Sequence, residues 1–196
     1  MATSGVAIRP ATVDDVRAIA EIRVACWRTA YAGLIEQHVL DALDPAAEAD
    51  RRRREWGTQP SAFSVATLGG SVVGFAMTCP YRGGSDQPDW PADPHAGEVA
   101  ALYVDPAVHG QGVGRALLSY ALTQLRADGS TVARLWVLAG NSRARRVYAA
   151  AGFTDESTVG VVKDYTPRGG TRDTPEIRYS RSLTDLAAWA PDDPGT

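Results

Sequence analysis

The sequence predicts an α/β protein in which strands and amphipathic helices alternate along the chain. Apolar runs of strand length recur between segments whose apolar residues follow helical spacing. A Gly69-Gly70 pair separates two strand-like runs, as in a hairpin with a mirror-image turn. The chain has 196 residues, of which 44% are hydrophobic, so it is long enough for one domain with a substantial core. We therefore expect a single domain over residues 1–196.

The first half of the chain predicts two helices between strands. The expected elements are a strand at 6–9, a helix from 12 to about 31, a helix over much of 45–56, and a hairpin of strands at 61–68 and 71–78. Thr12 is a favoured N-cap residue, and Asp15 stands three residues later as its partner in a capping box. Four arginines at 51–54 end the second helix. We interpret them as a solvated helix end paired with acidic neighbours rather than as a phosphate or nucleic-acid site.

The second half predicts two further helices and the remaining strands. The expected elements are a strand at 98–104, a helix ended by Asp128-Gly129, a buried strand at 131–138, a helix capped by Asn141 and closed by Gly152, and a last strand pair that begins at Phe153 and returns at 176–180. Residues 80–94 are rich in Pro, Gly and Asp and predict a loop. The Pro- and Asp-rich tail at 184–196 is expected to fray.

The most informative segment joins a strand to the following helix through three alternating glycines. Gly110, Gly112 and Gly114 allow a tight turn and bring bare backbone amides close to a ligand. The helix start adds unpaired N–H groups and a partial positive charge, so the unit is suited to hold phosphate. Arg115-Ala116 follow where a nucleoside-triphosphatase loop needs Lys-Ser or Lys-Thr, and the spacing differs from the dinucleotide pattern GxGxxG. A pyrophosphate-bearing cofactor of another kind is expected.

Two segments of the chain resemble the cofactor motifs of the GNAT N-acetyltransferase superfamily. After the strand end Val104-Asp105-Pro106, residues His109–Gly114 stand in the frame (Arg/Gln)-x-x-Gly-x-(Gly/Ala), with His109 in place of the usual Arg or Gln. Residues Asn141–Phe153 are similar to the second motif, Asn-xx-Ala-xxx-Tyr-xxx-Gly-Phe. The resemblance spans about residues 6–183. It implies an α/β (α+β) GNAT fold, with a mixed, mostly antiparallel sheet of about six to seven strands and about four flanking helices.

The resemblance implies acetyl-CoA as the cofactor and assigns its contacts. The backbone amides of the glycine turn would hold the pyrophosphate, and His109 would donate a hydrogen bond to it. The main chain at the strand end would pair with the pantetheine arm, and an N–H near Tyr103 or Val104 would face the thioester oxygen. One face of the second motif's helix would line the pantetheine arm and the sulfur. The residues expected at the cofactor are Leu102, Tyr103, Val104, His109, Gly110, Gln111, Gly112, Val113, Gly114, Arg115, Asn141, Ala144 and Tyr148.

Acetyl transfer from a thioester to an amine needs an acid for the leaving thiolate and a base for the ammonium. Tyr148 is the expected general acid, because the ordinary pKa of a phenol, ~10, is close to the ~8.5 of a thiol. The alternative for Tyr148 is a core residue. Glu98 is the expected general base, because some GNAT enzymes, including histone acetyltransferases, carry their catalytic glutamate at this position and apolar neighbours raise a carboxyl pKa. Alternatives are that Glu98 acts through a water, holds the acceptor's ammonium or lies in solvent, or that His95 is the base.

The acceptor is expected to be a primary amine of a small molecule or a peptide. In the family, the segment after the first helix, here about residues 27–43, helps to wall the acceptor site. Trp27, Tyr31, Glu36 and Trp90 are candidates for an aromatic and acidic pocket that binds an amine. Trp27 and Tyr31 are equally compatible with the core, and the sequence leaves both interpretations open.

Composition excludes several other classes of protein. The formal net charge of -3 gives no basic footprint for nucleic-acid binding, and no apolar run approaches the length of a membrane span. Only Cys26 and Cys79 are present, and no signal peptide is evident, so we expect a cytoplasmic enzyme with reduced thiols. No residues show metal-ligand spacing, and no metal is expected. A non-catalytic acyl-CoA sensor or structural module on the same fold is the alternative, and the oligomeric state stays open, with homodimers common in the family.

Overall fold

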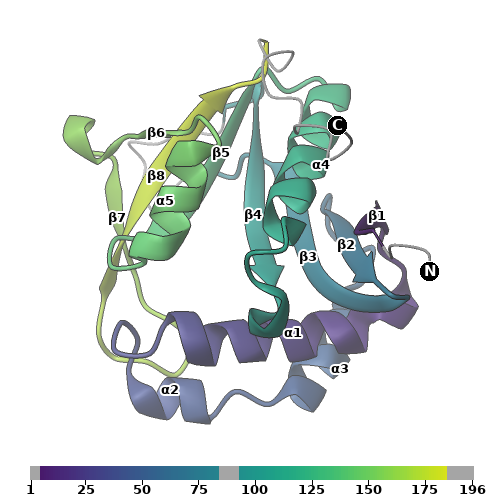
Figure 1. The fold of residues 1–196 in the computed structure, drawn as a ribbon. Helices are drawn as coiled ribbons and strands as arrows, with labels where there is room; N and C mark the ends of the chain where they lie inside the picture. Colours follow the sequence, from purple (N-terminus) through teal and green to yellow (C-terminus); the bar gives the residue numbers. More distant parts are fainter. Residues whose placement is uncertain (1–4, 84–92, 185–196) are drawn as a thin grey trace.

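The computed structural model describes residues 5–83 and 93–184. Its centre is an eight-stranded sheet with the order β1-β2-β3-β4-β5-β8-β6, and β7 pairs with β8 beside this path (Figure 1). The strands are β1 (Ala7–Pro10), β2 (Ala62–Leu68), β3 (Ser71–Pro80), β4 (Ala96–Val104), β5 (Val132–Leu138), β6 (Thr154–Asp155), β7 (Val162–Tyr165) and β8 (Thr174–Ser182). The predictions made for Trp90 and for residues 185–196 fall outside the described residues.

The predicted fold class is confirmed. Among the described strands, β4 and β5 pair in parallel and the other pairs are antiparallel, so the sheet is mixed and mostly antiparallel. The described chain contains the helices α1 (Val16–Ala30), α2 (Gln37–Asp41), α3 (Pro45–Glu55), α4 (Val113–Ala127) and α5 (Ser142–Ala150). The sequence prediction lacks α2, because an element of five residues is too short to show a periodic pattern. The strand expected to run from Phe153 through Val162 is divided into β6 and β7 by a 3-10 turn at Ser157–Val159.

Alternation along the central strands explains why helices pack on both faces of the sheet. Val65 of β2 and Phe75 of β3 are buried against Ile19 and Ile22 of α1. The next residues, Ala66 and Ala76, join the cluster formed by α4, because successive strand residues point to opposite faces. α5 lies on the same side as α4 (Figure 1), and its Tyr148 packs against that cluster. The buried face of α4 consists of Val113, Leu117, Leu118, Ala121, Leu122 and Leu125.

The predicted capping box at the start of the first helical segment is confirmed. The Thr12 N–H donates to Asp15 Oδ2 at 2.8 Å, and the Thr12 hydroxyl donates to the same oxygen at 3.3 Å. Arg9 of β1 donates to both carboxylate oxygens, at 2.7 and 2.8 Å. These hydrogen bonds stabilise the charged form and hold the pKa of Asp15 at about 2, with the Arg9 bond as the largest cause. The pair fixes β1 against the entry to α1.

The arginines near the end of α3 form ion pairs within their own helix, in agreement with the interpretation of the sequence. Arg51 and Arg52 donate to the Glu48 carboxylate at 2.7 to 2.9 Å, and Arg51 also donates to Glu55 at 2.7 Å. The guanidinium groups of Arg51 and Arg52 are therefore paired with carboxylates on neighbouring turns of the same helix.

β4 pairs differently with its two neighbours, and this difference opens the sheet. Its first residues, Ala96–Glu98, pair with Val132–Arg134 of β5, and the pairing stops there. On the other side β4 stays paired with β3 to the end of the strand, with a bulge that leaves Ala100 without a partner. β5 stays paired with β8 along its whole length. The second half of β4 therefore has a free edge toward β5.

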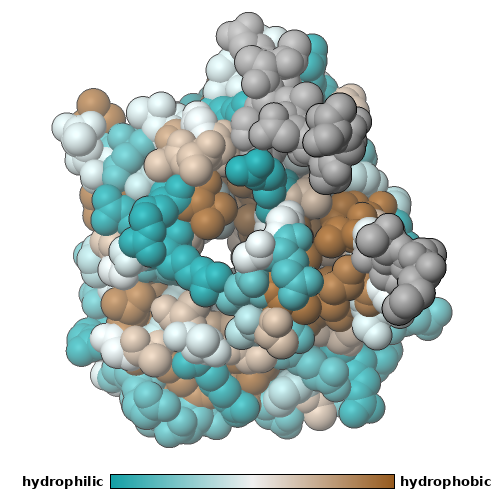
Figure 2. All heavy atoms as spheres, in the orientation of Figure 1, coloured by the Kyte–Doolittle hydropathy of each residue, from teal (hydrophilic) through white to brown (hydrophobic). Residues whose placement is uncertain are grey.

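The divergence of β4 from β5 is visible on the molecular surface. In the space-filling view an opening passes through the middle of the molecule, between the positions of α4 and α5 in Figure 1 (Figure 2). Within the residues that the structure describes, no helix is long and apolar enough to cross a bilayer.

Candidate active site

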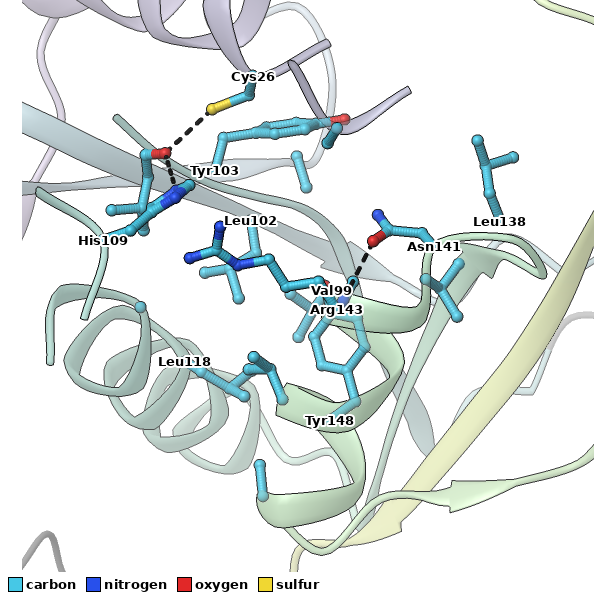
Figure 3. Close-up of a pocket in the computed structure, with 18 of the residues that line it drawn as sticks. Cys26, Val99, Leu102, Tyr103, His109, Leu118, Leu138, Asn141, Arg143 and Tyr148 are labelled. Atoms are coloured by element: carbon cyan, nitrogen blue, oxygen red, sulfur yellow. Dashed lines mark hydrogen bonds between the residues drawn. The ribbon is translucent and has the colours of Figure 1, made fainter. Parts of the chain in front are cut away.

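A cavity of about 630 Å³ occupies the space between the diverging strands, and we call it the splay cavity. Its walls are the free edge of β4, the end of β5, the turn before α4 and the inner face of α5 (Figure 3). The sequence-predicted cofactor residues that line it are Leu102, Tyr103, Val104, His109, Gly110, Gly112, Val113, Gly114, Arg115, Asn141, Ala144 and Tyr148. Gln111 belongs to the same turn but does not line the cavity.

The turn before α4 presents a group of free backbone amides. Gly110 and Gly112 have φ values of +85° and +78°, a conformation that residues with a side chain rarely adopt. In the described chain, the N–H groups of Gly110, Gly112, Val113, Gly114 and Arg115 donate to no protein acceptor. They lie at the N-terminal end of a 15-residue helix, whose dipole adds partial positive charge. Such a group of amides is suited to bind phosphate.

His109 and Gln111 are placed differently from the sequence expectation. Nε2 of His109 lies 2.9 Å from the Val104 carbonyl oxygen, and it must be the donor because a carbonyl only accepts. The Cys26 thiol donates to the same oxygen at 3.1 Å (Figure 3). This ring nitrogen therefore anchors the turn to the strand end instead of donating to a phosphate. The Gln111 amide is directed at the Val108 carbonyl, at 3.4 Å, so it is not part of the free group.

α5 brings the second motif to the opposite wall of the splay cavity. The Asn141 side chain accepts a hydrogen bond from the Ala144 N–H at 3.1 Å and so caps the helix, as predicted. Tyr148 is half-buried, with its ring centre 5.9 Å from that of Phe153. Burial raises the pKa of the Tyr148 phenol above its ordinary value, and the nearby Tyr103 adds to the effect. The phenol is therefore protonated at neutral pH, as a general acid must be.

A second cavity, of about 1030 Å³, lies on the α1 side of the sheet, and we call it the sheet-face cavity. Trp27 lines this cavity, and Tyr31 lines both cavities. Trp27 Nε1 donates to the Tyr103 hydroxyl at 3.0 Å, and the Trp27 and Tyr31 rings meet edge to face with centres 5.1 Å apart. The two residues therefore belong to a buried cluster and also form cavity wall, and their contact with an acceptor stays a prediction.

Glu98 is buried in β4, only 3% exposed, and lines the sheet-face cavity but not the splay cavity. Arg82 donates to both of its carboxylate oxygens, from Nη2 to Oε1 at 2.6 Å and from Nε to Oε2 at 3.2 Å. The Arg82 backbone N–H lies 3.4 Å from Oε2. The carboxylate expected to act as general base is thus held in a two-point ion pair.

Glu176 of β8 is a carboxylate at this site that the sequence did not assign to catalysis. Among the carboxylates that line either cavity in the described chain, Glu176 is the one that lines both. Lys163 Nζ lies 3.4 Å from it. Burial raises the pKa of Glu176; Lys163 opposes the shift, and the charge of Glu98 adds to it. The available signal was its place in the closing segment Glu176-x-Arg178-Tyr179, which resembles a family end but points to no role.

Glu36 and His95 lie outside the linings of both cavities. The Glu36 carboxylate accepts hydrogen bonds from the Thr171 N–H at 2.7 Å, the Thr171 hydroxyl at 3.0 Å and the Arg172 N–H at 3.0 Å. It therefore fastens the β7–β8 loop to the start of α2, instead of contacting a cavity. The His95 carbonyl accepts the Thr131 N–H at 2.8 Å, a contact that belongs to the sheet margin. These positions give no support to the acceptor contact expected of Glu36 or to His95 as a base.

Residues 17–153 match the sequence model of the acetyltransferase (GNAT) family. The chain belongs to this family. Among its relatives, a mycothiol acetyltransferase of Cellulomonas flavigena is 31% identical over 155 residues, which are 79% of this chain and 44% of that protein. The N-acetyltransferase YuaI of Bacillus subtilis is 31% identical over 136 residues, 69% of this chain and 73% of that protein. This GNAT chain spans less than half the length of the mycothiol acetyltransferases that it matches.

Solved structures of GNAT proteins share the fold of this chain. PaiA N-acetyltransferase of Thermoplasma acidophilum, in complex with coenzyme A, superposes with a TM-score of 0.64 at 17% identity, covering 91% of this chain and 99% of that one. The structure of yncA from Salmonella typhimurium with acetyl-CoA superposes with a TM-score of 0.64 at 23% identity, covering 96% and 98% of the two chains. The GNAT resemblance of the sequence is confirmed at the level of family and fold.

We expect the two cysteine thiols of the folded protein not to react with a thiol reagent such as DTNB at pH 8. Cys26 and Cys79 are free and buried, and burial raises the pKa of each thiol to about 11. At pH 8 about one thiol in a thousand is then the reactive thiolate. Absorbance titration of the native protein checks this, with denatured protein, which exposes both thiols, as the control. Rapid reaction of either thiol in the native protein would contradict the structure.

Proposed function

We propose that this protein is an acetyl-CoA-dependent N-acetyltransferase that transfers an acetyl group directly to a primary amine in a ternary complex. The proposal rests on one observation: the two cavities share a wall that includes Tyr103, Trp136 and Glu176. A cofactor in the splay cavity and an acceptor in the sheet-face cavity would meet at that wall. Two bound partners held in contact can react without a covalent protein intermediate, and much of the rate enhancement comes from their positioning.

Coenzyme A fits the splay cavity in two respects. The free amides at the start of α4 suit its pyrophosphate. The free edge of β4 offers main-chain groups to the amides of the pantetheine arm, as an added strand would. A main-chain N–H near Tyr103 or Val104 would then polarise the thioester carbonyl. The coenzyme A and acetyl-CoA complexes of the two structural neighbours support this choice of cofactor.

In this reaction the acceptor nitrogen loses two protons and the sulfur gains one. A base takes the first proton from the ammonium, and the lone pair of the neutral amine then attacks the thioester carbonyl carbon. The C–S bond breaks, coenzyme A leaves as a thiolate that an acid protonates, and the nitrogen gives up its second proton to become the amide. Tyr148 is the proposed acid, because it lines the splay cavity and burial keeps its phenol protonated.

Two carboxylates compete for the role of base. Glu98 lines the sheet-face cavity, and Arg82 donates hydrogen bonds to both of its carboxylate oxygens. Glu176 lies where the two cavities meet, and burial raises its pKa toward the range in which a carboxylate accepts a proton usefully. We propose Glu176 as the base and Glu98 as the carboxylate that attracts the ammonium.

The proposed acceptor is a primary amine carried by a small molecule or a peptide. The aromatic wall that Trp27, Tyr31 and Tyr103 form would cover its apolar part. Several relatives are named mycothiol acetyltransferases, but the chain spans less than half of their length, so the class of amine is proposed rather than one compound.

The proposed function predicts that coenzyme A and acetyl-CoA raise the thermal unfolding midpoint, whereas ATP and NAD do not. A ligand at about 100 times its Kd stabilises the fold by roughly 2.7 kcal/mol, which a melting curve detects. Acceptor-dependent release of coenzyme A thiol is then measured over a panel of primary amines. Binding without transfer to any amine would favour the non-catalytic acyl-CoA module. A shift with ATP or NAD alone would contradict the proposal.

Replacing Tyr148 by Phe is expected to lower kcat about 10- to 100-fold and to leave the Kd of acetyl-CoA within a factor of two or so. The hydroxyl serves the leaving thiolate, and a thiolate leaves comparatively well without an acid, so the loss falls at the low end for general acid catalysis. Steady-state kinetics and calorimetry measure the two quantities. Tyr120→Phe, on α4 away from both cavity linings, is the matched control. Unchanged kcat in Tyr148→Phe would exclude the acid role.

Replacing Glu176 by Gln is expected to abolish the acidic limb of the pH–rate profile and to lower kcat about 100-fold or more. The base works when ionised, so kcat/KM of the wild type should fall as pH drops through a pKa above the ordinary ~4.3 of glutamate, in the direction that burial shifts Glu176. Glu98→Gln should raise the KM of the amine more than it lowers kcat. The reverse pattern, with the acidic limb lost in Glu98→Gln and kept in Glu176→Gln, would assign the base to Glu98.

A further inference from the structure

Arg143 is a cation of α5 that points into the splay cavity. Figure 3 shows its side chain crossing from the helix toward the end of β4, where Cys26 and His109 meet. The residue is exposed, and in the described part of the chain its guanidinium has no hydrogen-bond or ion-pair partner. Arg145 of the same helix differs, because it binds Asp155 at 3.0 Å. Arg143 is therefore available to a ligand.

The charge of Arg143 acts at the far side of the cavity. It lowers the pKa of the Cys26 thiol, against the larger effect of burial that raises it. Cys26 lies on α1 and donates to the Val104 carbonyl oxygen, the same oxygen that holds the His109 ring. Figure 3 shows the guanidinium in the cavity near this end of the strand, and not over the outer surface of α5.

The free amides of the turn before α4 would neutralise only part of the negative charge of a bound phosphate, so another group is needed for the rest. These amides supply partial positive charge only. His109 stands where the motif usually has Arg or Gln, and its Nε2 donor is used on the Val104 carbonyl. Arg115 is the cation that the α4 side contributes to the cavity wall, and Arg143 is the corresponding cation on the α5 side.

We propose that Arg143 is a phosphate ligand of the cofactor, which reaches from α5 across the splay cavity to a phosphate held at the start of α4. The proposal rests on the proposed use of acetyl-CoA. A guanidinium presents two parallel N–H donors to phosphate oxygens, and such charge-assisted pairs are stronger than neutral hydrogen bonds. Arg143 thus supplies a full positive charge that the free amides of the turn do not supply.

The same contact would give α5 a packing partner. No residue of α5 is buried, and its inner face, with Ala144, Val147 and Tyr148, lines the cavity. A cofactor held by Arg143 and by the turn would connect α4 and α5 across the diverging strands. Hydrogen exchange of the amides of residues 142–150 should therefore slow when coenzyme A binds, and should slow less in a variant without the guanidinium.

Calorimetric titration of coenzyme A, 3′-dephospho-coenzyme A and pantetheine tests the proposal without any acceptor. Arg143→Gln is expected to weaken coenzyme A binding about 10- to 100-fold, the range for one hydrogen-bonded charge, and to leave pantetheine binding unchanged. Arg146→Gln is the matched control, because Arg146 is an exposed arginine of the same helix outside both cavity linings. It should bind all three probes as the wild type does.

The dephosphorylated probe identifies the phosphate. A defect of Arg143→Gln that persists with 3′-dephospho-coenzyme A supports the contact with the pyrophosphate at the start of α4, whereas a defect that disappears would assign the contact to the ribose 3′-phosphate and overturn the proposal as stated. Equal affinity of Arg143→Gln and wild type for coenzyme A, or equal weakening for pantetheine, would overturn it. A wild-type protein that binds no coenzyme A would contradict the proposed function itself, which is a different result from a loss confined to the variant.

Discussion

β4 leaves β5 after three paired residues, and the other features of the site depend on this divergence. Each half of the sheet stays intact, because β4 remains paired with β3 and β5 with β8. Because the hydrogen bonds to β5 stop there, the main-chain N–H and C=O groups on the free edge of β4 have no partner among the described strands. Burying such groups without partners in an apolar interior would raise the free energy of the folded state. The splay cavity opens beside this edge, and under the proposed function the amides of the pantetheine arm would pair with it.

The Val104 carbonyl fastens the end of that free edge. It accepts hydrogen bonds from Cys26 of α1 and from the His109 ring, so one oxygen connects a helix of one face, the strand and the turn that leads to α4. The turn is thereby held with its free amides at the end of the splay cavity. The Nε2 donor of His109 is used on this carbonyl. Under the proposed use of acetyl-CoA, the charge of a phosphate would be met by the free amides and by arginines that line the cavity.

Charge is arranged differently on the two faces of the sheet. The splay cavity presents Arg115 and Arg143 at its walls, which suits an anionic cofactor. In the sheet-face cavity Glu98 lies close enough for its charge to add to the raised pKa of Glu176. Burying a carboxylate is costly unless it is paired, and here Arg82 pairs with Glu98 and Lys163 with Glu176.

The sequence by itself determined the features whose signal is local. The capping box of Thr12 and Asp15, the glycine turn and the Asn141 cap each depend on residues a few positions apart, so their chemistry can be predicted from spacing alone. Contacts between distant residues were decided by the tertiary structure: Cys26 meets Val104 across 78 positions, and Glu176 reaches the site only because β8 is the neighbour of β5. The hydrophobic periodicity of the sequence predicts strands but does not show which strands become neighbours. For the same reason the sequence suggested a base in β4, whereas the pairing of β8 with β5 brought a second carboxylate to the wall shared by the two cavities, and the pairing of β7 with β8 brought its lysine.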